Sequence, residues 1–334
     1  RDYYRRRNLL EISQKLAVSV YDKDSNLDDE ITRIIDNISN NVFIQNGAEH
    51  WKKYLNDFYD DLDNRIKNPN NIWGIPTGLN DFDKITGGLQ LGEMMLLSGM
   101  PGMGKSMLAM QMGVQMSQNH PGAIYSVEMP GVQMVRRIIS SYSNVEVKKM
   151  KSGNVTDEEI ENIIRAYEKL NNYNVYLSDS SHWTTSALRA DLQKLKIKNK
   201  IKWFVFDYMF LAEDGAGMTE TERTTYLSRQ FKMICRQLNL AGIIIHSMRK
   251  PGNANNRPEQ YELRSSFQAA YDADLICFLH EFTPLNPEEQ QIPENERQNL
   301  RSLSFGKGRE LENPKKIIHL VKKPTIPMFG DLKT

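Results

Sequence analysis

A glycine-rich stretch of eight residues has the composition and the spacing of a loop that binds phosphate groups. Glycines let successive backbone N–H groups point toward a phosphate, and the positive dipole end of a following helix favours the same anion. In the pattern G-x-x-x-x-G-K-[ST], the lysine reaches the β- and γ-phosphates and the final hydroxyl coordinates Mg²⁺. The sequence therefore predicts a site for ATP and Mg²⁺, with Lys105 and Ser106 in these two roles. The stretch fits the pattern without a mismatch and reads Gly99-Met100-Pro101-Gly102-Met103-Gly104-Lys105-Ser106.

Two carboxylates follow apolar segments and would complete a site that hydrolyses the bound nucleotide. Asp207 ends the apolar segment 203–206, which has the form of a Walker B strand, and would hold Mg²⁺ through a water. Glu128 ends the apolar segment 123–127 and is expected beside the γ-phosphate, where it would orient or deprotonate water. The alternatives are that Asp207 begins a turn and that Glu128 caps a helix starting near Pro130. We favour the catalytic interpretation of both because a phosphate-binding loop precedes them.

From residue 92 onward, short apolar segments alternate with stretches of amphipathic helical length. This alternation predicts an α/β fold with a mostly parallel sheet that is covered by helices on both faces. Two further segments after residue 299 lack an intervening helix and predict an antiparallel extension of the sheet. Because the carboxyl ends of parallel strands share one edge of a sheet, this fold would bring the phosphate loop, Glu128 and Asp207 together. The predicted strands cover residues 94–97, 124–127, 175–177, 203–206, 243–245, 275–279, 300–305 and 317–321.

The N-terminal fifth of the chain has a different pattern. Apolar residues recur at intervals of three and four over residues 1–68, as in the stripe formed by Leu9, Ile12 and Leu16, which predicts helices. A helix with one narrow apolar face needs a partner surface to bury it. The Asn-Pro-Asn-Asn sequence at 68–71 breaks the pattern. We therefore expect a helical region over residues 1–70 and an α/β domain over residues 71–334, in a chain that, beginning with Arg, is a fragment of a longer protein.

Composition excludes several classes of protein. The 43 Lys and Arg residues balance 42 Asp and Glu residues to a net charge of +1, so any surface that binds nucleic acid must be local. Cys235 and Cys277 lie far apart within apolar segments, which favours buried thiols over a disulfide. Neither an apolar run of about 18–20 residues nor a signal peptide is found in the sequence. These features predict a cytoplasmic protein, of a bacterial cell or of the host if the gene belongs to a phage.

In their order along the chain, these motifs resemble the RecA-like motor domain of DnaB-type replicative DNA helicases. Ser126-Val127-Glu128-Met129 is similar to the family's S-L-E-M, whose Glu is the catalytic carboxylate, and Asp207-Tyr208 matches its D-Y ending. The resemblance covers roughly residues 3–334. It also rests on the segments 74–83 and 86–89, similar to the family's entry motif, and on 263–266 and 271–274, similar to its L-R-x-S-G and Q-D-A-D block.

The resemblance implies the architecture and activity of that family. It implies a RecA-like P-loop ATPase core, a homo-hexameric ring, ATP-driven 5′–3′ movement on single-stranded DNA, and unwinding of duplex DNA at a replication fork. A primase and a helicase loader are the partners that it implies. Residues 3–10 look like the linker helix that joins an N-terminal collar to the motor and packs on the neighbouring subunit's motor. That interpretation agrees with the apolar stripe that needs a partner surface.

Two positions depart from the family pattern. Most members have a Gln that senses the γ-phosphate after the strand corresponding to 243–245, whereas this chain has the sequence His-Ser-Met-Arg-Lys at 246–250. That stretch is more similar to the mitochondrial Twinkle helicase and related phage primase-helicases, in which a His fills the role, so His246 is predicted as the sensor. The alternative is a His at a strand end with no such role. The family's arginine finger, in a K-x-R motif, fits Lys307-Gly308-Arg309, which assigns Arg309 as the finger and Lys307 as its assistant; the alternative is a solvated basic turn.

Loops after two of the predicted strands have the position expected of loops that line a central channel for DNA. They cover residues 213–221 and 250–262, and the second carries cations separated by glycine and asparagine, which suits a phosphate backbone. The family grips DNA through the region that matches 264–266. A polar loop is the plain alternative. The predicted DNA-binding residues are Lys250, Arg257, Arg264, Ser265 and Ser266.

Two other functions are compatible with a phosphate loop. A RecA/RadA-like DNA-dependent ATPase would share Lys105, Glu128 and Asp207 but would not unwind DNA. A non-catalytic loader or regulator would have a degenerate site, which does not fit the two intact carboxylates. The match to the linker helix and the position of Lys307-Gly308-Arg309 favour the helicase.

Overall fold

The computed structural model describes residues 14, 50–68, 72–248, 258, 263, 268–308, 311, 316–323 and 325–332. The chain forms two compact units, of which one comprises Arg1–Asn71 and Thr184–Lys194 and the other comprises Ile72–Trp183 and Leu195–Thr334. Among the described residues, no helix is both long enough and apolar enough to span a membrane.

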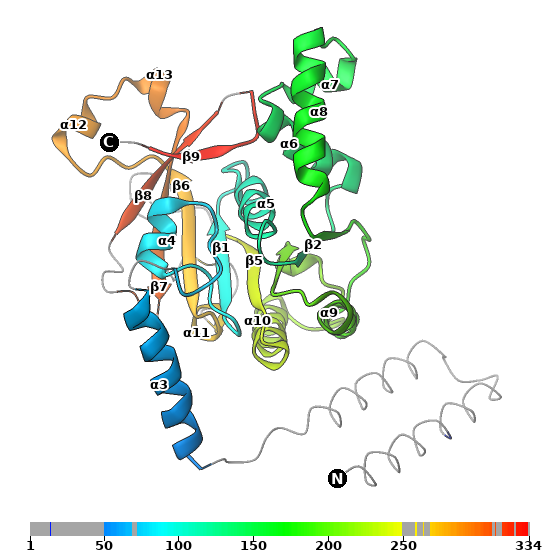
Figure 1. Cartoon of the computed structure of the whole chain (residues 1–334), viewed down its shortest axis with the longest axis vertical. Helices are drawn as coiled ribbons and strands as arrows, with labels where there is room; N and C mark the ends of the chain where they lie inside the picture. The colour runs from blue at the N-terminus through cyan, green and yellow to red at the C-terminus, as the bar shows by residue number, and fades with distance from the viewer. Residues whose placement is uncertain are drawn as a thin grey trace. The chain divides into compact units, whose positions relative to one another are not determined.

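In the first unit, the described N-terminal part contains helix α3 (Lys52–Lys67), drawn in blue in Figure 1. Two ion pairs one helical turn apart, Arg65 with Asp61 and Lys67 with Asp63, support its C-terminal half. Every residue of α3 is exposed, including the apolar ones, and Trp51 just before it is 68% exposed. The helical prediction is confirmed over 52–67, whereas the predicted stripes within residues 9–42 lie outside the described residues.

The second unit is built on a nine-stranded sheet. Its order is β3-β2-β4-β5-β1-β6-β7-β8-β9, in which β3 to β6 pair in parallel and the pairs from β6 to β9 are antiparallel. The predicted α/β fold, with its parallel sheet and antiparallel extension, is therefore confirmed. The strands are β1 (Met94–Gly99), β2 (Gly122–Ser126), β3 (Val175–Ser178), β4 (Trp203–Asp207), β5 (Ala241–Ser247), β6 (Leu275–Glu281), β7 (Leu300–Gly308), β8 (Ile317–Lys322) and β9 (Phe329–Asp331).

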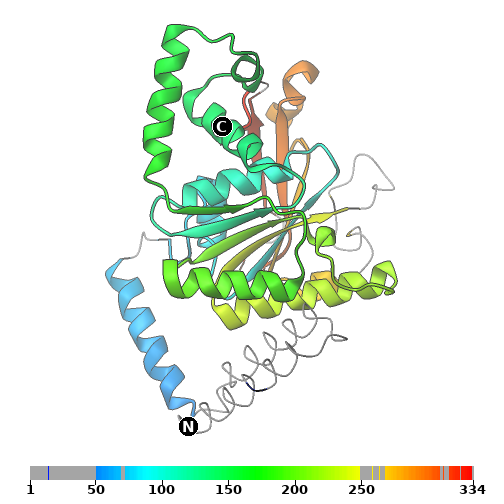
Figure 2. The ribbon, with the colours of Figure 1, turned by 90° about the vertical axis from the view of Figure 1, so that its right-hand side faces the viewer.

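Helices lie on both faces of this sheet, with α5 on one face and α10 on the other (Figure 2). The first face forms the larger core, in which Leu97 of β1 and Ile243 and Ile245 of β5 pack with Leu108 of α5. The helices of this unit are α4 (Asn80–Thr86), α5 (Lys105–Met116), α6 (Gly131–Ser143), α7 (Val147–Ser152), α8 (Asp157–Asn171), the 3₁₀ helix η1 (Met209–Leu211), α10 (Glu220–Leu238), α11 (Gln268–Asp272), α12 (Pro287–Gln290) and α13 (Glu294–Arg297). Helix α9 (Thr185–Asn199) belongs to the first unit as far as Lys194.

The opposite face has its own aromatic packing. Phe206 of β4 and Phe231 of α10 are both fully buried, with ring centroids 5.0 Å apart. The free cysteines Cys235 and Cys277 are buried as predicted, and burial raises the pKa of both thiols.

Trp203 fixes the pairing of β2, which leads to Glu128 two residues further on, with β4, which ends at Asp207. Gly122 pairs with Trp203, and a Cβ at Gly122 would lie only 2.0 Å from an indole carbon, so the close approach requires glycine. The indole Nε1 donates to the carbonyl of His120 at 2.7 Å. The register then places Ser126 opposite Asp207.

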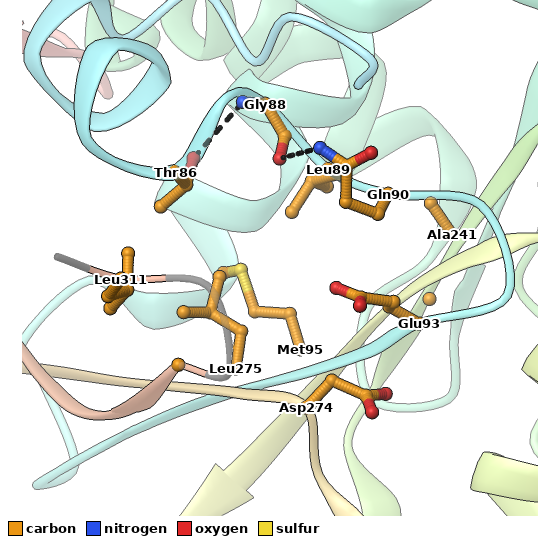
Figure 3. A pocket seen from close by; sticks show the side chains of 12 residues that line it. Thr86, Gly88, Leu89, Gln90, Glu93, Met95, Ala241, Asp274, Leu275 and Leu311 are labelled. Atoms are coloured by element: carbon orange, nitrogen blue, oxygen red, sulfur yellow. Dashed lines mark hydrogen bonds between the residues drawn. The ribbon is translucent and has the colours of Figure 1, made fainter. Parts of the chain in front are cut away.

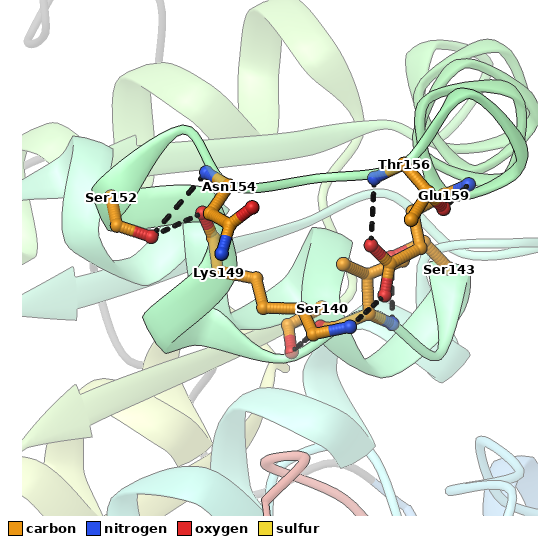
Figure 4. A network of polar contacts seen from close by, with 8 residues as sticks. Ser140, Ser143, Lys149, Ser152, Asn154, Thr156 and Glu159 are labelled. Atoms are coloured by element: carbon orange, nitrogen blue, oxygen red, sulfur yellow. Dashed lines mark hydrogen bonds and ion pairs between the residues drawn. The ribbon is translucent and has the colours of Figure 1, made fainter.

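A group of three helices, α6 to α8, is inserted between β2 and β3. Thr156 and Glu159 form a capping box at the start of α8, and Lys149 of α7 donates to Glu159 at 2.6 Å (Figure 4). These contacts fix α7 against α8. On the outer surface, Val132 of α6 and Ile164 and Tyr167 of α8 stay 71%, 49% and 62% exposed, which leaves apolar area for a partner.

Candidate active site

The glycine-rich loop connects the carboxyl end of β1 to the start of α5. Gly102 and Gly104 have φ angles of +81° and +103°, in the region that glycine adopts without a steric cost. A Cβ built at Gly102 would meet no described atom within 4 Å, so the space next to the loop is open at this point. The first turn of α5 contains no acidic residue. The helix therefore presents uncompensated N–H groups and its positive dipole end to the loop.

The Lys105 ammonium lies inside the curve of this loop. Its Nζ donates to the carbonyl oxygens of Gly99 and Met100 at 2.8 and 2.9 Å. Burial lowers the pKa of Lys105, while the carboxylates of Asp207 and Glu128 act in the opposite direction. The cation is thus already directed toward the space that the loop surrounds.

Asp207 and Ser106 contact each other at the same edge of the sheet. The Ser106 hydroxyl donates to the Asp207 carboxylate, which is only 8% exposed. Burial raises the pKa of Asp207, with Glu128 adding to the effect, while the hydrogen bond from Ser106 and the cations of Lys105 and Arg137 oppose it. A hydroxyl and a buried carboxylate in contact are oxygen ligands of the type that Mg²⁺ prefers.

Glu128 is held beside this pair by the backbone. It lies two residues beyond β2, and the N–H of Val127 donates to the carbonyl of Asp207 at 3.1 Å. The residue before α6 is Pro130, whose side chain makes no capping hydrogen bond; instead the N–H of Gly131 donates to Asp179 at 2.8 Å. Asp179, and not Glu128, thus takes this hydrogen bond from the start of α6, and the catalytic role of Glu128 stays a prediction. The exposed Glu128 side chain remains available to a ligand.

His246 lies near the carboxyl end of β5, and its role as a γ-phosphate sensor stays a prediction. Ile243 and Ile245 of β5 point into the core with α5, and successive side chains of a strand alternate between faces, so His246 lies on the α10 face. Its ring is fully buried and packs against Phe210, with centroids 5.2 Å apart. The last residue of β5 on the α5 face is Ser247, which pairs with Gly99 at the start of the loop.

The described part of the K-x-R motif makes a contact that the sequence does not predict. Lys307 donates to the carbonyl oxygens of Ala270 and Tyr271 at 2.7 and 2.9 Å, at the C-terminal end of α11. A cation at this end complements the helix dipole. The other predicted residues, Arg309 and the DNA-binding set Lys250, Arg257, Arg264, Ser265 and Ser266, lie outside the described residues.

Two arginines near this site are not among the residues that the sequence predicts. Arg137 of α6 is close enough to Asp207 to lower its pKa, and Arg223 of α10 donates to the backbone carbonyls of Phe210, Ala212 and Asp214. Neither belongs to a local pattern. Their spacing from the carboxylate, 70 residues before it and 16 after it by the numbering, gives no signal in a sequence window.

A cavity of about 30 Å³ lies at the opposite, amino-terminal ends of β1, β5 and β6 (Figure 3). Its lining includes Asp274, whose buried carboxylate binds Lys232 and accepts from the N–H of Met94 at 2.8 Å. Gln90 on the other side donates to the carbonyl of Gly88 at 3.4 Å. The cavity is a structural feature at the start of the strands and is separate from the phosphate loop.

The loop between β1 and α5, the Ser106–Asp207 contact and the parallel sheet together define a P-loop nucleotide-binding core of the RecA-like type. Solved structures share this fold. One of them, a solved ATPase domain, aligns with a TM-score of 0.77 at 23% identity, covering 86% of this chain and 100% of that one. "The Structure Of A DnaB-Like Replicative Helicase And Its Interactions With Primase" aligns with a TM-score of 0.80 at 21% identity, covering 99% of this chain and 77% of that one.

Residues 74–325 match the family "DnaB-like helicase C terminal domain", and the chain belongs to that family. Among its relatives, the "Replicative DNA helicase DnaC" of Bacillus subtilis is 24% identical over 91% of this chain and 67% of its own length. The "Replicative DNA helicase DnaB" of Geobacillus stearothermophilus is 27% identical over 82% of this chain and 62% of its own length. The chain thus spans about two thirds of the length of these relatives.

Proposed function

We propose that this chain is the motor of a replicative DNA helicase, which hydrolyses ATP with Mg²⁺ to move 5′–3′ on single-stranded DNA and to unwind duplex DNA. The observation that carries the proposal is the assembly of Lys105, Ser106, Asp207 and Glu128 at one edge of the sheet, in a chain of the DnaB-like family. The relatives named as replicative helicases support the substrate class.

The residues fit ATP and Mg²⁺ by their donor set. Lys105 would exchange the carbonyls of Gly99 and Met100 for phosphate oxygens, which are stronger acceptors because they carry charge. The N–H groups of the loop and the start of α5 would bind the same phosphates. Ser106 and Asp207 would hold the metal ion, which would neutralise part of the phosphate charge when bound. Glu128 would orient a water and accept its proton.

We further propose that the working form is a homo-hexamer in which each site is completed by the next subunit. Arg309, assisted by Lys307, would supply the transition-state cation in trans. The uncovered apolar residues of α3 and of the α6–α8 helices support self-association, because a monomer rarely exposes so much apolar side chain. A primase is a proposed partner, since the similar solved structure describes such interactions of that helicase, and a helicase loader is a second.

DNA would pass through the ring and contact the loops at the carboxyl edge of the sheet. We assign the grip to Lys250, Arg257, Arg264, Ser265 and Ser266, because cations and small polar residues suit a phosphate backbone. Binding of this kind weakens as salt rises, since each neutralised phosphate releases counterions. His246 remains a predicted γ-phosphate sensor, although Ser247 has the position on the α5 face of β5.

The experiment that tests the function is strand displacement from a forked duplex with a free 5′ single strand. The wild-type chain should hydrolyse ATP faster with single-stranded DNA and displace the strand, whereas Lys105→Ala should lose both activities. Stimulated ATP turnover without displacement, for the chain assembled as a hexamer, would instead support a RecA/RadA-like DNA-dependent ATPase. Absence of DNA stimulation would contradict both.

A further inference from the structure

The guanidinium of Arg223 binds three backbone carbonyls in the segment that follows Asp207. Its Nε donates to the carbonyl of Asp214 at 2.9 Å, and its Nη2 donates to those of Phe210 at 3.1 Å and of Ala212. Alternate residues of one short segment are thus tied to a single side chain. The planar fork of an arginine can hold such a set, whereas a lysine ammonium acts as a point charge.

The start of α10 does not need Arg223 for its own stability. Thr219 caps the helix through the N–H of Glu222, and Glu222 bonds back to the N–H of Thr219 in a complete capping box. Two acidic residues already complement the dipole in the first turn, and a cation there is unfavourable by the same physics. The contacts of Arg223 therefore serve the loop and not the helix.

The bound segment lies between a catalytic carboxylate and a glycine turn. On one side, the carbonyl of Asp207 accepts from Val127, next to Glu128. On the other side, Gly215 and Gly217 have φ angles of +85° and +83°, and a Cβ at Gly215 would lie 3.0 Å from Cγ of Arg223. The arginine stem thus passes directly under the turn, and the turn and the carboxylate are joined by one rigidly held stretch of chain.

The helix that carries Arg223 is itself firmly anchored. Ser228 of α10 donates to Asp272 at 2.5 Å, and Lys232 binds the buried carboxylate of Asp274. Buried residues such as Phe231 fix α10 on the sheet. α10 therefore gives Arg223 a fixed base, from which its guanidinium holds the segment 210–214 that leads back to Asp207.

We propose that Arg223 is a positioning residue that couples the loop 208–217 to the catalytic carboxylates, so that a single DNA strand on the glycine turn sets the rate of ATP turnover. This inference rests on the proposed function. To that function it adds Arg223 and the loop 208–217 as the structural link between bound DNA and the carboxylates. The ligand on the turn is a nucleic-acid backbone, whose phosphates would accept from the N–H groups of the turn. Arg223 contributes by holding the carbonyls of the segment away from that strand.

The test compares Arg223→Gln and Arg223→Lys with Arg229→Gln, which removes a cation from an exposed position of the same helix. ATP turnover of the full chain is measured against the concentration of an oligothymidylate, and amide hydrogen exchange is followed over residues 208–217. In Arg223→Gln, half-maximal stimulation should need roughly 2- to 30-fold more DNA, the range for residues that carry coupling between sites. Exchange in the segment should rise, Arg223→Lys should lie between Gln and wild type, and Arg229→Gln should match wild type.

Two results would overturn the inference. One is an unchanged DNA concentration for half-maximal stimulation in Arg223→Gln. The other is a uniform loss of turnover with and without DNA, together with a lower melting temperature, which would assign Arg223 a purely structural role. If the wild-type chain shows no stimulation by DNA, the proposed function fails instead, and the two failures are therefore distinguishable.

Discussion

Replacing Glu128 by Gln should separate catalysis from folding. Glu128 is exposed, and the N–H at the start of α6 is bound by Asp179 and not by Glu128. The free energy of unfolding of Glu128→Gln should therefore change by less than about 0.5 kcal/mol, as for other surface substitutions. Loss of a general base should lower ATP turnover by roughly 10²- to 10⁴-fold. That factor corresponds to about 2.7–5.4 kcal/mol in the activation free energy.

The matched control is Asp179→Ala, which should have the opposite pattern. It removes the carboxylate that accepts from Gly131 at 2.8 Å, and the loss of such a helix-terminal acceptor costs about 0.5–1 kcal/mol at an exposed site. ATP turnover should stay at the wild-type value. Phosphate release at saturating ATP and DNA measures ATP turnover, and urea unfolding followed by circular dichroism measures the free energy of unfolding. Wild-type turnover in Glu128→Gln, or a larger loss of stability in it than in Asp179→Ala, would refute the reasoning.

Three further outcomes are expected. Arg309→Ala should keep nucleotide binding, measured by fluorescent-nucleotide titration, and lose roughly 10³- to 10⁵-fold in turnover, because a finger acts only on the transition state; normal turnover would contradict the assignment. Trp203→Ala should lower the free energy of unfolding by about 3–5 kcal/mol, since the indole is fully buried against Gly122, whereas Trp51→Ala at an exposed site should change it by less than about 0.5 kcal/mol in the same urea titration. Burial lowers the pKa of His319, an effect larger than the opposing one of Glu289, so the unfolded chain binds a proton more readily below about pH 6.5. Stability should therefore fall as the pH drops below that value, and His319→Gln should flatten this part of the curve measured by thermal unfolding at several pH values.

The sequence predicts the sheet and the core of the site because both depend on short-range patterns. The β1–loop–α5 unit is specified by glycines and one lysine within eight residues, and Asp207 is identified by the apolar strand before it. Parallel pairing then brings the strand ends together without further information, as the register of Ser126 with Asp207 confirms.

The position of His246 illustrates what a pattern leaves open. In a strand, one residue of difference moves a side chain to the other face of the sheet. The segment 243–245 is apolar throughout, as expected for a strand buried on both faces, so it contains no alternation that would indicate which face His246 takes. The face that His246 takes is decided only by the pairing of β5 with β1 and by the packing of its ring against Phe210.

Arg223 and Lys307 could not be found for a different reason. Both bind backbone carbonyls of segments that reach them only after the chain has folded, Arg223 across a loop and Lys307 across 36 or 37 residues. Backbone carbonyls are present at every residue, so no side-chain type in the sequence marks the acceptor. Contacts of this kind depend on tertiary structure, and the sequence pattern around either cation is that of an ordinary exposed charge.

The opposite pKa shifts of Lys105 and Asp207 have a common origin that relates stability to function. Burial lowers the pKa of the ammonium and raises that of the carboxylate, so both groups are charged at a cost to the folded state. At Asp207, the folded chain binds a proton more readily than the unfolded chain between the ordinary pKa of 3.8 and the raised value, so stability falls as the pH rises through that window and stays lower above it. The hydrogen bonds from Ser106 and to Met100 offset only part of this cost. A ligand that carries both phosphate and a divalent cation would compensate the charges of Lys105 and Asp207 at once. Its binding would therefore stabilise the fold at pH values above that window, where both groups are charged.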